Sequence, residues 1–147
     1  MTRVFLDASC WVAAAGSPSG GSEVILKLAQ TVCLQVVVTQ QVLLEAEHNI
    51  KNKLNEEALL RYYQKLGTLE LEVIPPTTPA EESQWNALVA PKDCHVLAAA
   101  YKANVDVLVS LDKKHIVNEQ VKQGFPIHVA DTKEFFQWLT EEEQGSG

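Results

Sequence analysis

The sequence predicts a three-layer α/β/α sandwich around a central, mainly parallel five-stranded sheet. Short runs of β-forming residues alternate with helical segments along the chain, as in strands joined by crossover helices. The run Val36–Val38 is apolar throughout, which is typical of a strand covered on both faces. A length of 147 residues suits one domain. We expect this domain over residues 1–140 and a solvated tail over 141–147.

Three strands are expected in the first half of the chain. They are runs of β-branched and aliphatic residues that span Arg3–Leu6, Leu34–Val38 and Leu71–Ile74. A helical turn over Ser9–Ala15 follows the first strand, and Ser22 then caps a helix. The face of this helix toward the core is expected to carry four apolar residues: Val24, Ile25, Leu28 and Ala29.

Two helices are expected between the second and third strands. Thr39 caps the first, over Gln40–Lys53, and Asn55 opens the second. The apolar side of the second helix is expected to carry Leu59, Leu60, Tyr63 and Leu66.

The second half of the chain continues the alternation of helices and strands. Thr78-Pro79-Ala80-Glu81 is a capping box, so we expect a helix from there to about Val89. Asp93 starts the next helix after Pro91. The remaining elements are a strand at Val105–Ser110, a short helix near Lys113–Gln120, a strand at Pro126–Val129, and a last helix capped by Asp131 that carries Phe135, Phe136 and Trp138.

Four acidic residues are expected to meet at the carboxyl edge of this sheet, where open parallel sheets place their chemistry. They are Asp7, Glu45, Asp93 and Asp112. Two unit charges at ~4 Å repel by about 4 kcal/mol at an effective dielectric of ~20, so such a cluster favours a cation. Mg²⁺ and Mn²⁺ prefer oxygen ligands and can activate water against a phosphodiester. Glu47 competes with Glu45 but lies further from the strand end, on another side of the helix.

Each of these acids also has a purely structural interpretation. Asp93 and Asp112 are suited to cap helices, and Glu45 is suited to a solvated helix face. Asp106 and Asp131 are expected to be structural, at the entry of a strand and in a capping box.

Several other classes of protein are excluded or disfavoured. Cys10, Cys33 and Cys94 are too few and too scattered for a disulfide framework or a zinc site. Cys94 and His95 point ~100° apart on a helix, so they do not form a nucleophile–base pair. Neither a GxGxxG nor a Walker A motif is present. Ser9 replaces the second Asp that a haloacid dehalogenase needs, and Pro75-Pro76 stands where a response-regulator receiver has its phosphoacceptor.

The charge balance argues against a protein that coats nucleic acid. Lys and Arg number 12 and Asp and Glu number 19, which gives a net charge of −7. A nucleic acid would therefore need local positive charge. Six residues could supply it by contacting phosphate, or could simply lie on solvated helix faces: Lys51, Lys53, Arg61, Lys65, Lys113 and Lys114. No run is apolar enough for a signal peptide or a membrane span, so we expect a cytoplasmic protein with no membrane partner.

Five segments stand in a characteristic order along the chain, namely Val4–Ser9, Val38–Glu45, Asp93–Ala100, Val105–Asp112 and Val129–Phe136. In these segments, and over residues 2–140 as a whole, the chain resembles the PIN domain family. This resemblance implies a ribonuclease in which Asp7, Glu45, Asp93 and Asp112 hold Mg²⁺ or Mn²⁺, while Ser9 and Ser110 orient carboxylates or water.

The resemblance also implies partners and leaves two points open. VapC-type toxins of this family pair with small antitoxin proteins and often form homodimers, so both are expected here beside the RNA substrate. Many relatives have a further acid where this chain has His115, which leaves one or two metal ions open. The alternative function is a PIN-like module that binds RNA or protein without cleaving.

Overall fold

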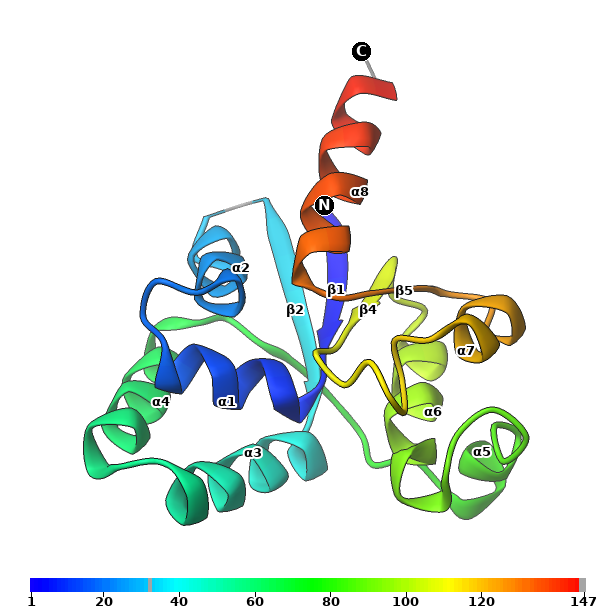
Figure 1. Ribbon diagram of the computed structural model, residues 1–147, viewed down its shortest axis with the longest axis horizontal. Helices are drawn as coiled ribbons and strands as arrows, with labels where there is room; N and C mark the ends of the chain where they lie inside the picture. Colours follow the sequence, from blue (N-terminus) through cyan, green and yellow to red (C-terminus); the bar gives the residue numbers. More distant parts are fainter. Residues whose placement is uncertain (32, 146–147) are drawn as a thin grey trace.

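The computed structural model describes residues 1–31 and 33–145, and within them five parallel strands form one sheet in the order β3-β2-β1-β4-β5 (Figure 1). The strands are β1 (Thr2–Leu6), β2 (Leu34–Thr39), β3 (Glu72–Ile74), β4 (Val107–Val109) and β5 (His128–Ala130). Val4 of β1 lies opposite both Val36 and Val107, so β1 is the central strand. The predicted α/β class and the five strands are confirmed.

Helices cover both faces of the sheet. They are α1 (Ala8–Gly16), α2 (Gly21–Ala29), α3 (Gln40–Lys53), α4 (Glu56–Thr68), α5 (Pro79–Ser83), the 3₁₀ turn η1 (Pro91–Asp93), α6 (Cys94–Ala103), α7 (Glu119–Gly124) and α8 (Thr132–Gly145). Helices α1 to α4 lie on one side and α5 to α7 on the other, as right-handed crossovers require (Figure 1). Helix α8 packs against α2, β4 and β5. This is the predicted three-layer arrangement.

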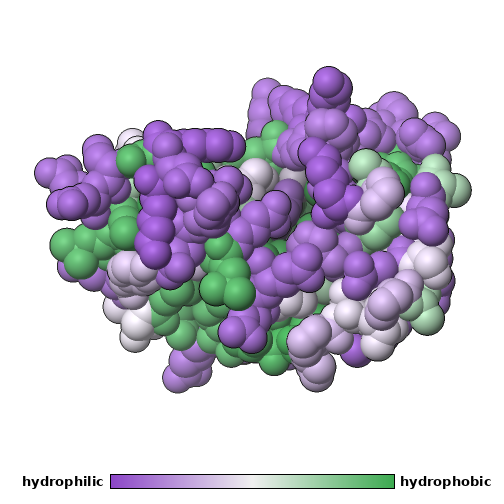
Figure 2. All heavy atoms as spheres, turned by 90° about the horizontal axis from the view of Figure 1, so that it is seen from below, coloured by the Kyte–Doolittle hydropathy of each residue, from purple (hydrophilic) through white to green (hydrophobic). Residues whose placement is uncertain are grey.

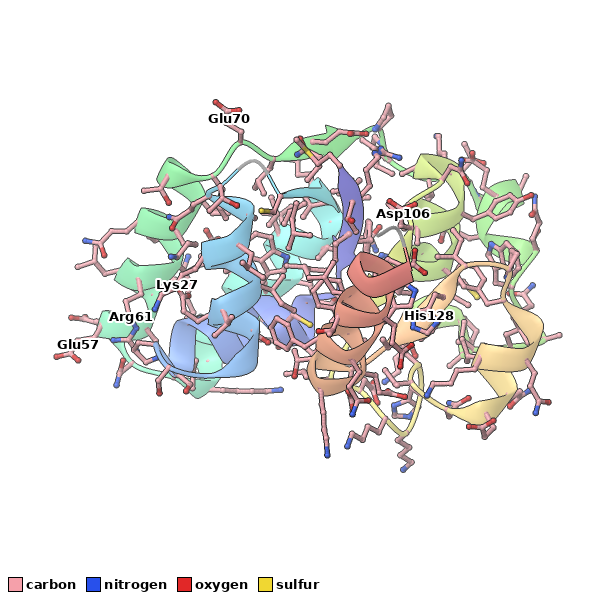
Figure 3. The ribbon with its side chains drawn as sticks, turned by 90° about the horizontal axis from the view of Figure 1, so that it is seen from above. Lys27, Glu57, Arg61, Glu70, Asp106 and His128 are labelled. Carbon is pink, nitrogen blue, oxygen red and sulfur yellow. The ribbon has the colours of Figure 1, made fainter. Side chains whose placement is uncertain are left out.

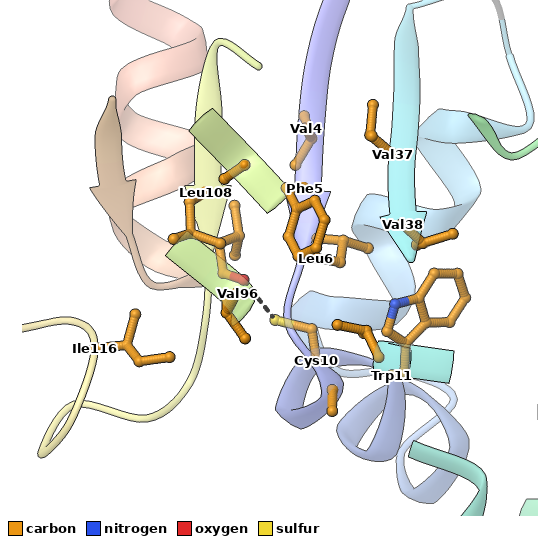
Figure 4. Close-up of a cluster of buried hydrophobic side chains, with 14 of the residues drawn as sticks. Val4, Phe5, Leu6, Cys10, Trp11, Val37, Val38, Val96, Leu108 and Ile116 are labelled. Atoms are coloured by element: carbon orange, nitrogen blue, oxygen red, sulfur yellow. Dashed lines mark hydrogen bonds between the residues drawn. The ribbon is translucent and has the colours of Figure 1, made fainter. Parts of the chain in front are cut away.

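The core fixes the position of α1 directly after the central strand. Phe5 and Leu6 are fully buried in β1, and the Cys10 Sγ of α1 lies 3.5 Å from the carbonyl oxygen of Val109 in β4 (Figure 4). Trp11 is also fully buried and packs edge-on against Tyr62 of α4, with 6.3 Å between the ring centroids. The start of α1 is therefore held between the sheet and α4.

The predicted inner face of α2 is wrong at one residue. Val24 is 40% exposed, whereas Glu23 beside it is buried. The carboxylate of Glu23 is neutralised there by Lys65 of α4, with 2.5 Å between nitrogen and oxygen. The helix also begins at Gly21 with Gly20 as its N-cap, so Ser22 is inside the first turn and not at the cap.

The predicted apolar side of α4 is also wrong in part. Leu60 and Tyr63 are exposed, whereas Ala58 and Tyr62 are the buried residues of this helix. Tyr62 reaches inward because its hydroxyl donates a hydrogen bond to the carbonyl of Leu43 at 2.8 Å.

Two helices in the second half differ in extent from the prediction. Helix α5 ends at Ser83, because Trp85 turns inward between the rings of Tyr101 and Phe125. The short helix expected near 113–120 begins only at Glu119, after its N-cap Asn118.

The last helix, α8, is longer than predicted. It continues to Gly145 through most of the expected tail, and residues 146–147 of that tail lie outside the described residues. Across the part of the chain that is described, no helix is long and apolar enough to cross a membrane.

Candidate active site

An open cleft of about 460 Å³ lies at the carboxyl edge of the sheet. Its walls come from the end of β1, the start of α1, helix α3, the 3₁₀ turn η1 and the loop after β4. In the view from below, hydrophilic side chains run through the middle of this side of the molecule (Figure 2). All four predicted acids line the cleft. The full lining is Asp7, Ala8, Ser9, Val12, Ala13, Glu45, Asn49, Lys53, Lys92, Asp93, Val96 and Asp112.

Asp7 is the most deeply buried of the four acids. It is the N-cap of α1, and its Oδ1 accepts a hydrogen bond from the N–H of Ala8 at 2.7 Å. Its Oδ2 accepts one from the Oγ of Ser110, also at 2.7 Å. Burial raises the pKa of Asp7, the hydrogen bonds partly offset that rise, and the charge of Asp93 adds to it. A cation would relieve both causes of the rise.

The two predicted serines connect the ends of the two central strands. Ser9 Oγ donates to Asp7 Oδ2 at 3.3 Å and accepts from the N–H of Leu111 at 3.0 Å. Ser110 Oγ accepts from the N–H of Asp112 at 3.1 Å while it donates to Asp7. These hydroxyls therefore hold the carboxylate of Asp7 against the backbone that leads to Asp112.

Asp112 is engaged with its own loop. Its Oδ1 accepts a hydrogen bond from the backbone N–H of His115 at 3.0 Å, and the Nδ1 of the same histidine lies 3.0 Å from Oδ2. The carboxylate thus organises the turn after β4 while it also lines the cleft. His115 therefore lies against Asp112. The helix cap expected of Asp112 is wrong, because the next helix begins only at Glu119 with Asn118 as its N-cap.

Asp93 does not cap the helix that it precedes. Its side chain makes no capping hydrogen bond to α6, which speaks against the structural interpretation of this residue. Its Oδ2 is buried and has no hydrogen-bond partner among the described residues. A buried carboxylate oxygen without a partner costs free energy unless something else satisfies it.

Glu45 faces the cleft from α3, and Glu47 does not. The side chain of Glu45 is about half exposed, and its Oε2 lies 3.9 Å from the Nε2 of His95 on α6. Partial burial raises the pKa of Glu45, the charge of His95 lowers it, and Asp7 and Asp93 raise it further. Glu47 instead accepts a hydrogen bond from the Tyr63 hydroxyl at 2.8 Å.

The donor set fits a hard divalent cation. It consists of carboxylate oxygens, and one of them, the buried Asp93 Oδ2, has no partner among the residues that the structure describes. Within residues 1–31 and 33–145, no three His, Cys, Asp or Glu side chains are grouped closely enough to hold one ion together. The acids therefore line an open cleft. This suits Mg²⁺ better than a closed cage would, because Mg²⁺ keeps several waters and takes one or two carboxylates.

Three polar residues that line the cleft or lie beside it were not predicted from the sequence. Asn49 comes four residues after Glu45, so helical spacing places it on the same face. Lys92 precedes Asp93 on η1, and His95 follows on α6 as a buried histidine whose Nδ1 has no partner among the described residues. The spacing from Glu45 was a usable signal for Asn49, whereas nothing local marked His95.

Comparison with known proteins identifies the family. A family model described as the PIN domain matches residues 3–114, a range that includes all four acids. The chain belongs to the PIN domain family. No curated protein matches the chain in sequence.

Solved structures resemble this PIN domain in fold. VapC20 of Mycobacterium tuberculosis, described as a sarcin-ricin loop cleaving toxin, is 18% identical with a TM-score of 0.57, over 83% of this chain and 95% of its own. DNA-bound VapBC from Salmonella typhimurium is 18% identical with a TM-score of 0.60, over 90% and 99%. VapBC-1 from nontypeable Haemophilus influenzae is 13% identical with a TM-score of 0.60, also over 90% and 99%. At these identities the likeness concerns the fold.

Proposed function

We propose that this PIN domain is an endoribonuclease that hydrolyses RNA phosphodiester bonds with the help of Mg²⁺ or Mn²⁺. The observation that carries the proposal is the cleft itself. Four acids from four separate segments of the chain line it, and the buried Oδ2 of Asp93 has no partner among the described residues. The PIN family and the VapC-like fold support this choice of reaction.

The residues of the cleft have separate tasks in this proposal. Asp7 and Asp93 would hold the ion, with Asp112 at its edge, and the hydroxyls of Ser9 and Ser110 keep the Asp7 carboxylate in place. When bound, Mg²⁺ or Mn²⁺ supplies charge stabilisation of the phosphate and lowers the pKa of a bound water. Glu45 is half exposed at the mouth of the cleft, where it can orient the attacking water.

We also propose the partners that the family resemblance implies. They are an RNA substrate, a small antitoxin protein and a second copy of the chain, in the cytoplasm. The VapBC structures with the same fold are consistent with an antitoxin. Leu44 of α3 together with Leu60 and Tyr63 of α4 leave apolar surface exposed, which is consistent with a further interface.

The test of the reaction is RNA cleavage by the purified protein with Mn²⁺ or Mg²⁺, with EDTA as a control. We expect Asp93→Asn and Glu45→Gln to lower the rate by about 100-fold, the order found when groups that stabilise a transition state are removed. Glu57→Gln, on the exposed face of α4 (Figure 3), is the matched control and should cleave normally. Cleavage that is indifferent to EDTA and to both cleft substitutions would refute the proposal.

A second readout measures the ion without any reaction. At a Mn²⁺ concentration of ~100 times Kd, binding to the folded state adds about 2.7 kcal/mol to its stability. This gain should appear in the wild type and in Glu57→Gln, and it should be lost in Asp93→Asn. The alternative function, an RNA- or protein-binding module, predicts salt-sensitive binding without metal-dependent cleavage.

A further inference from the structure

We propose that Lys53 and Lys92 bind substrate phosphates on either side of the acids, so that one RNA strand runs through the cleft along α3. The inference rests on the proposed function for the nature of the ligand, a single-stranded nucleic acid. It assigns the residues that position the strand, which are separate from the acids that act on it.

Helix α3 presents three polar side chains to the cleft in a row. Glu45, Asn49 and Lys53 are spaced by four residues, so they share one face of the helix, and all three line the cleft. At 1.5 Å per residue, Lys53 lies about 12 Å further along the helix axis than Glu45. Along α3, the polar groups that face the cleft are therefore first a carboxylate, then an amide and then an ammonium group. A strand whose reacting phosphate lies at Glu45 would present a neighbouring phosphate to Lys53.

Lys92 stands on the opposite wall of the cleft. It lies in η1 between Pro91 and Asp93, on the side of the sheet that carries α5 to α7. Its ammonium is close enough to Glu45 to offset part of the rise in pKa that burial causes in that carboxyl. A strand that enters between α3 and η1 would therefore meet a cation on each wall, at different phosphates.

Four of the other cations named from the sequence have partners of their own, and Lys114 lines a separate hollow beside His115 and Asn118. Lys51 pairs with Glu47, Lys65 with Glu23 and Lys113 with Asp131, and the Nε of Arg61 donates to the carbonyl of Ala15. Neither Lys53 nor Lys92 forms an ion pair within the part of the chain that is described, although both line a cleft with four acids. The lysines thus remain available for phosphate and the acids for a metal cation.

Because the net charge is −7, two contacts between lysines and phosphates are expected to have a large effect on the affinity for RNA. An acidic protein gains little from long-range attraction to RNA, so its affinity depends on local neutralisation of phosphates. For a single strand, each neutralised phosphate contributes about 0.7 to the slope of log K against log salt. Loss of one lysine should remove about that amount from the slope.

The test measures binding of a fluorescein-labelled single-stranded RNA dodecamer by anisotropy, across a range of NaCl concentrations with Mn²⁺ present. All proteins carry Asp7→Asn, which stops the proposed cleavage during the measurement. We expect Lys53→Gln and Lys92→Gln each to weaken binding and to lower the salt slope by about 0.7, and the double variant by about 1.4. Lys27→Gln on α2 removes the same charge far from the cleft and should change neither value (Figure 3).

Cleavage kinetics without Asp7→Asn give the second readout. The two lysine substitutions should raise KM for the same RNA while kcat stays within about twofold, because the acids are untouched. Metal-dependent cleavage with an unchanged slope and an unchanged KM in the double variant would overturn the role of the lysines and leave the nuclease proposal standing. If the salt slope falls in the lysine variants but the wild type does not cleave RNA, the nuclease proposal is overturned and the role of the lysines stands. Absence of RNA binding in every protein would overturn both.

Discussion

The fold is expected to lose much of its free energy of unfolding when Lys65 of α4, which pairs with Glu23 of α2, is replaced by an uncharged residue. The side chains of Glu23 and Lys65 are only 10% and 20% exposed, and 2.5 Å separates nitrogen from oxygen. Both residues line a hollow of about 210 Å³ between α1, α2 and α4, next to Trp11. Lys65→Met would leave the Glu23 carboxylate, which is only 10% exposed, without its cation.

The expected cost follows from this geometry. Removal of one partner of a buried pair costs about 3–5 kcal/mol, and the partial exposure of Lys65 places this site near 3 kcal/mol. Glu23→Leu should cost less, about 1 kcal/mol, because the long stem of Lys65 can carry its ammonium out to solvent. The double variant should lie close to the wild type, since apolar replacement of both partners is often neutral.

Urea unfolding followed by far-UV circular dichroism gives the four free energies of this cycle. Lys27→Met, which changes an exposed lysine of α2, is the control and should stay within about 0.5 kcal/mol. A cost of less than about 1 kcal/mol for Lys65→Met would contradict the proposed burial of the pair, and so would a double variant whose cost equals the sum of the two single costs.

Three further predictions concern other parts of the chain. Ser110→Ala removes the 2.7 Å hydrogen bond to Asp7 and should cost about 1.5–3 kcal/mol in urea unfolding, with Ser83→Ala on the surface as a small-effect control. Asn104 ends α6 at φ 51°, so Asn104→Val should cost about 1–2 kcal/mol, and Asn104→Gly should be tolerated; equal stability of the two variants would contradict this. The capping hydrogen bonds of Glu81 lower its pKa from 4.5, so it stabilises the fold above pH 4.5 and this contribution is lost as pH falls through the lowered value. Glu81→Gln should therefore be less stable than the wild type at pH 6 and match it at pH 2, as thermal unfolding at the two pH values can check.

The features that could be predicted depend on signals within a few residues. Thr39 and Asn55 accept hydrogen bonds from the third residue of the helices that they cap, at 3.1 and 2.9 Å. The capping boxes that begin at Thr78 and Asp131 also form as predicted. These interactions are local, so a short stretch of sequence contains both partners.

The helix faces could not all be predicted, because their burial depends on distant partners. The carboxylate of Glu23 can be buried on α2 because Lys65 of α4 pairs with it. Val24 is displaced to the surface as a result. A pattern of hydrophobic residues does not predict this ion pair. On α4, the hydroxyl of Tyr62 binds a carbonyl of α3, which a pattern of apolar residues does not reveal.

The location of the cleft could be predicted better than its full lining. Asp7, Ser110 and Asp112 follow strand ends, and parallel strands bring their carboxyl ends to one edge. Lys92 and Asn49 belong to segments whose side chains meet only across the cleft. Their contribution depends on how α3 and η1 are placed by the sheet, which the sequence alone did not specify.

The order of the strands also determines when the cleft can exist during synthesis. Val4 of the central strand pairs with Val107, so 103 residues separate the two partners along the chain. Ribosomes add about 5–20 residues per second, which makes this interval about 5–20 s. Until β4 has emerged and docked, Asp7 lacks the hydroxyl of Ser110, and Asp112 has not joined it. Under the proposed function, a nascent chain that has not yet docked β4 therefore lacks the assembled cleft and has no cleavage site.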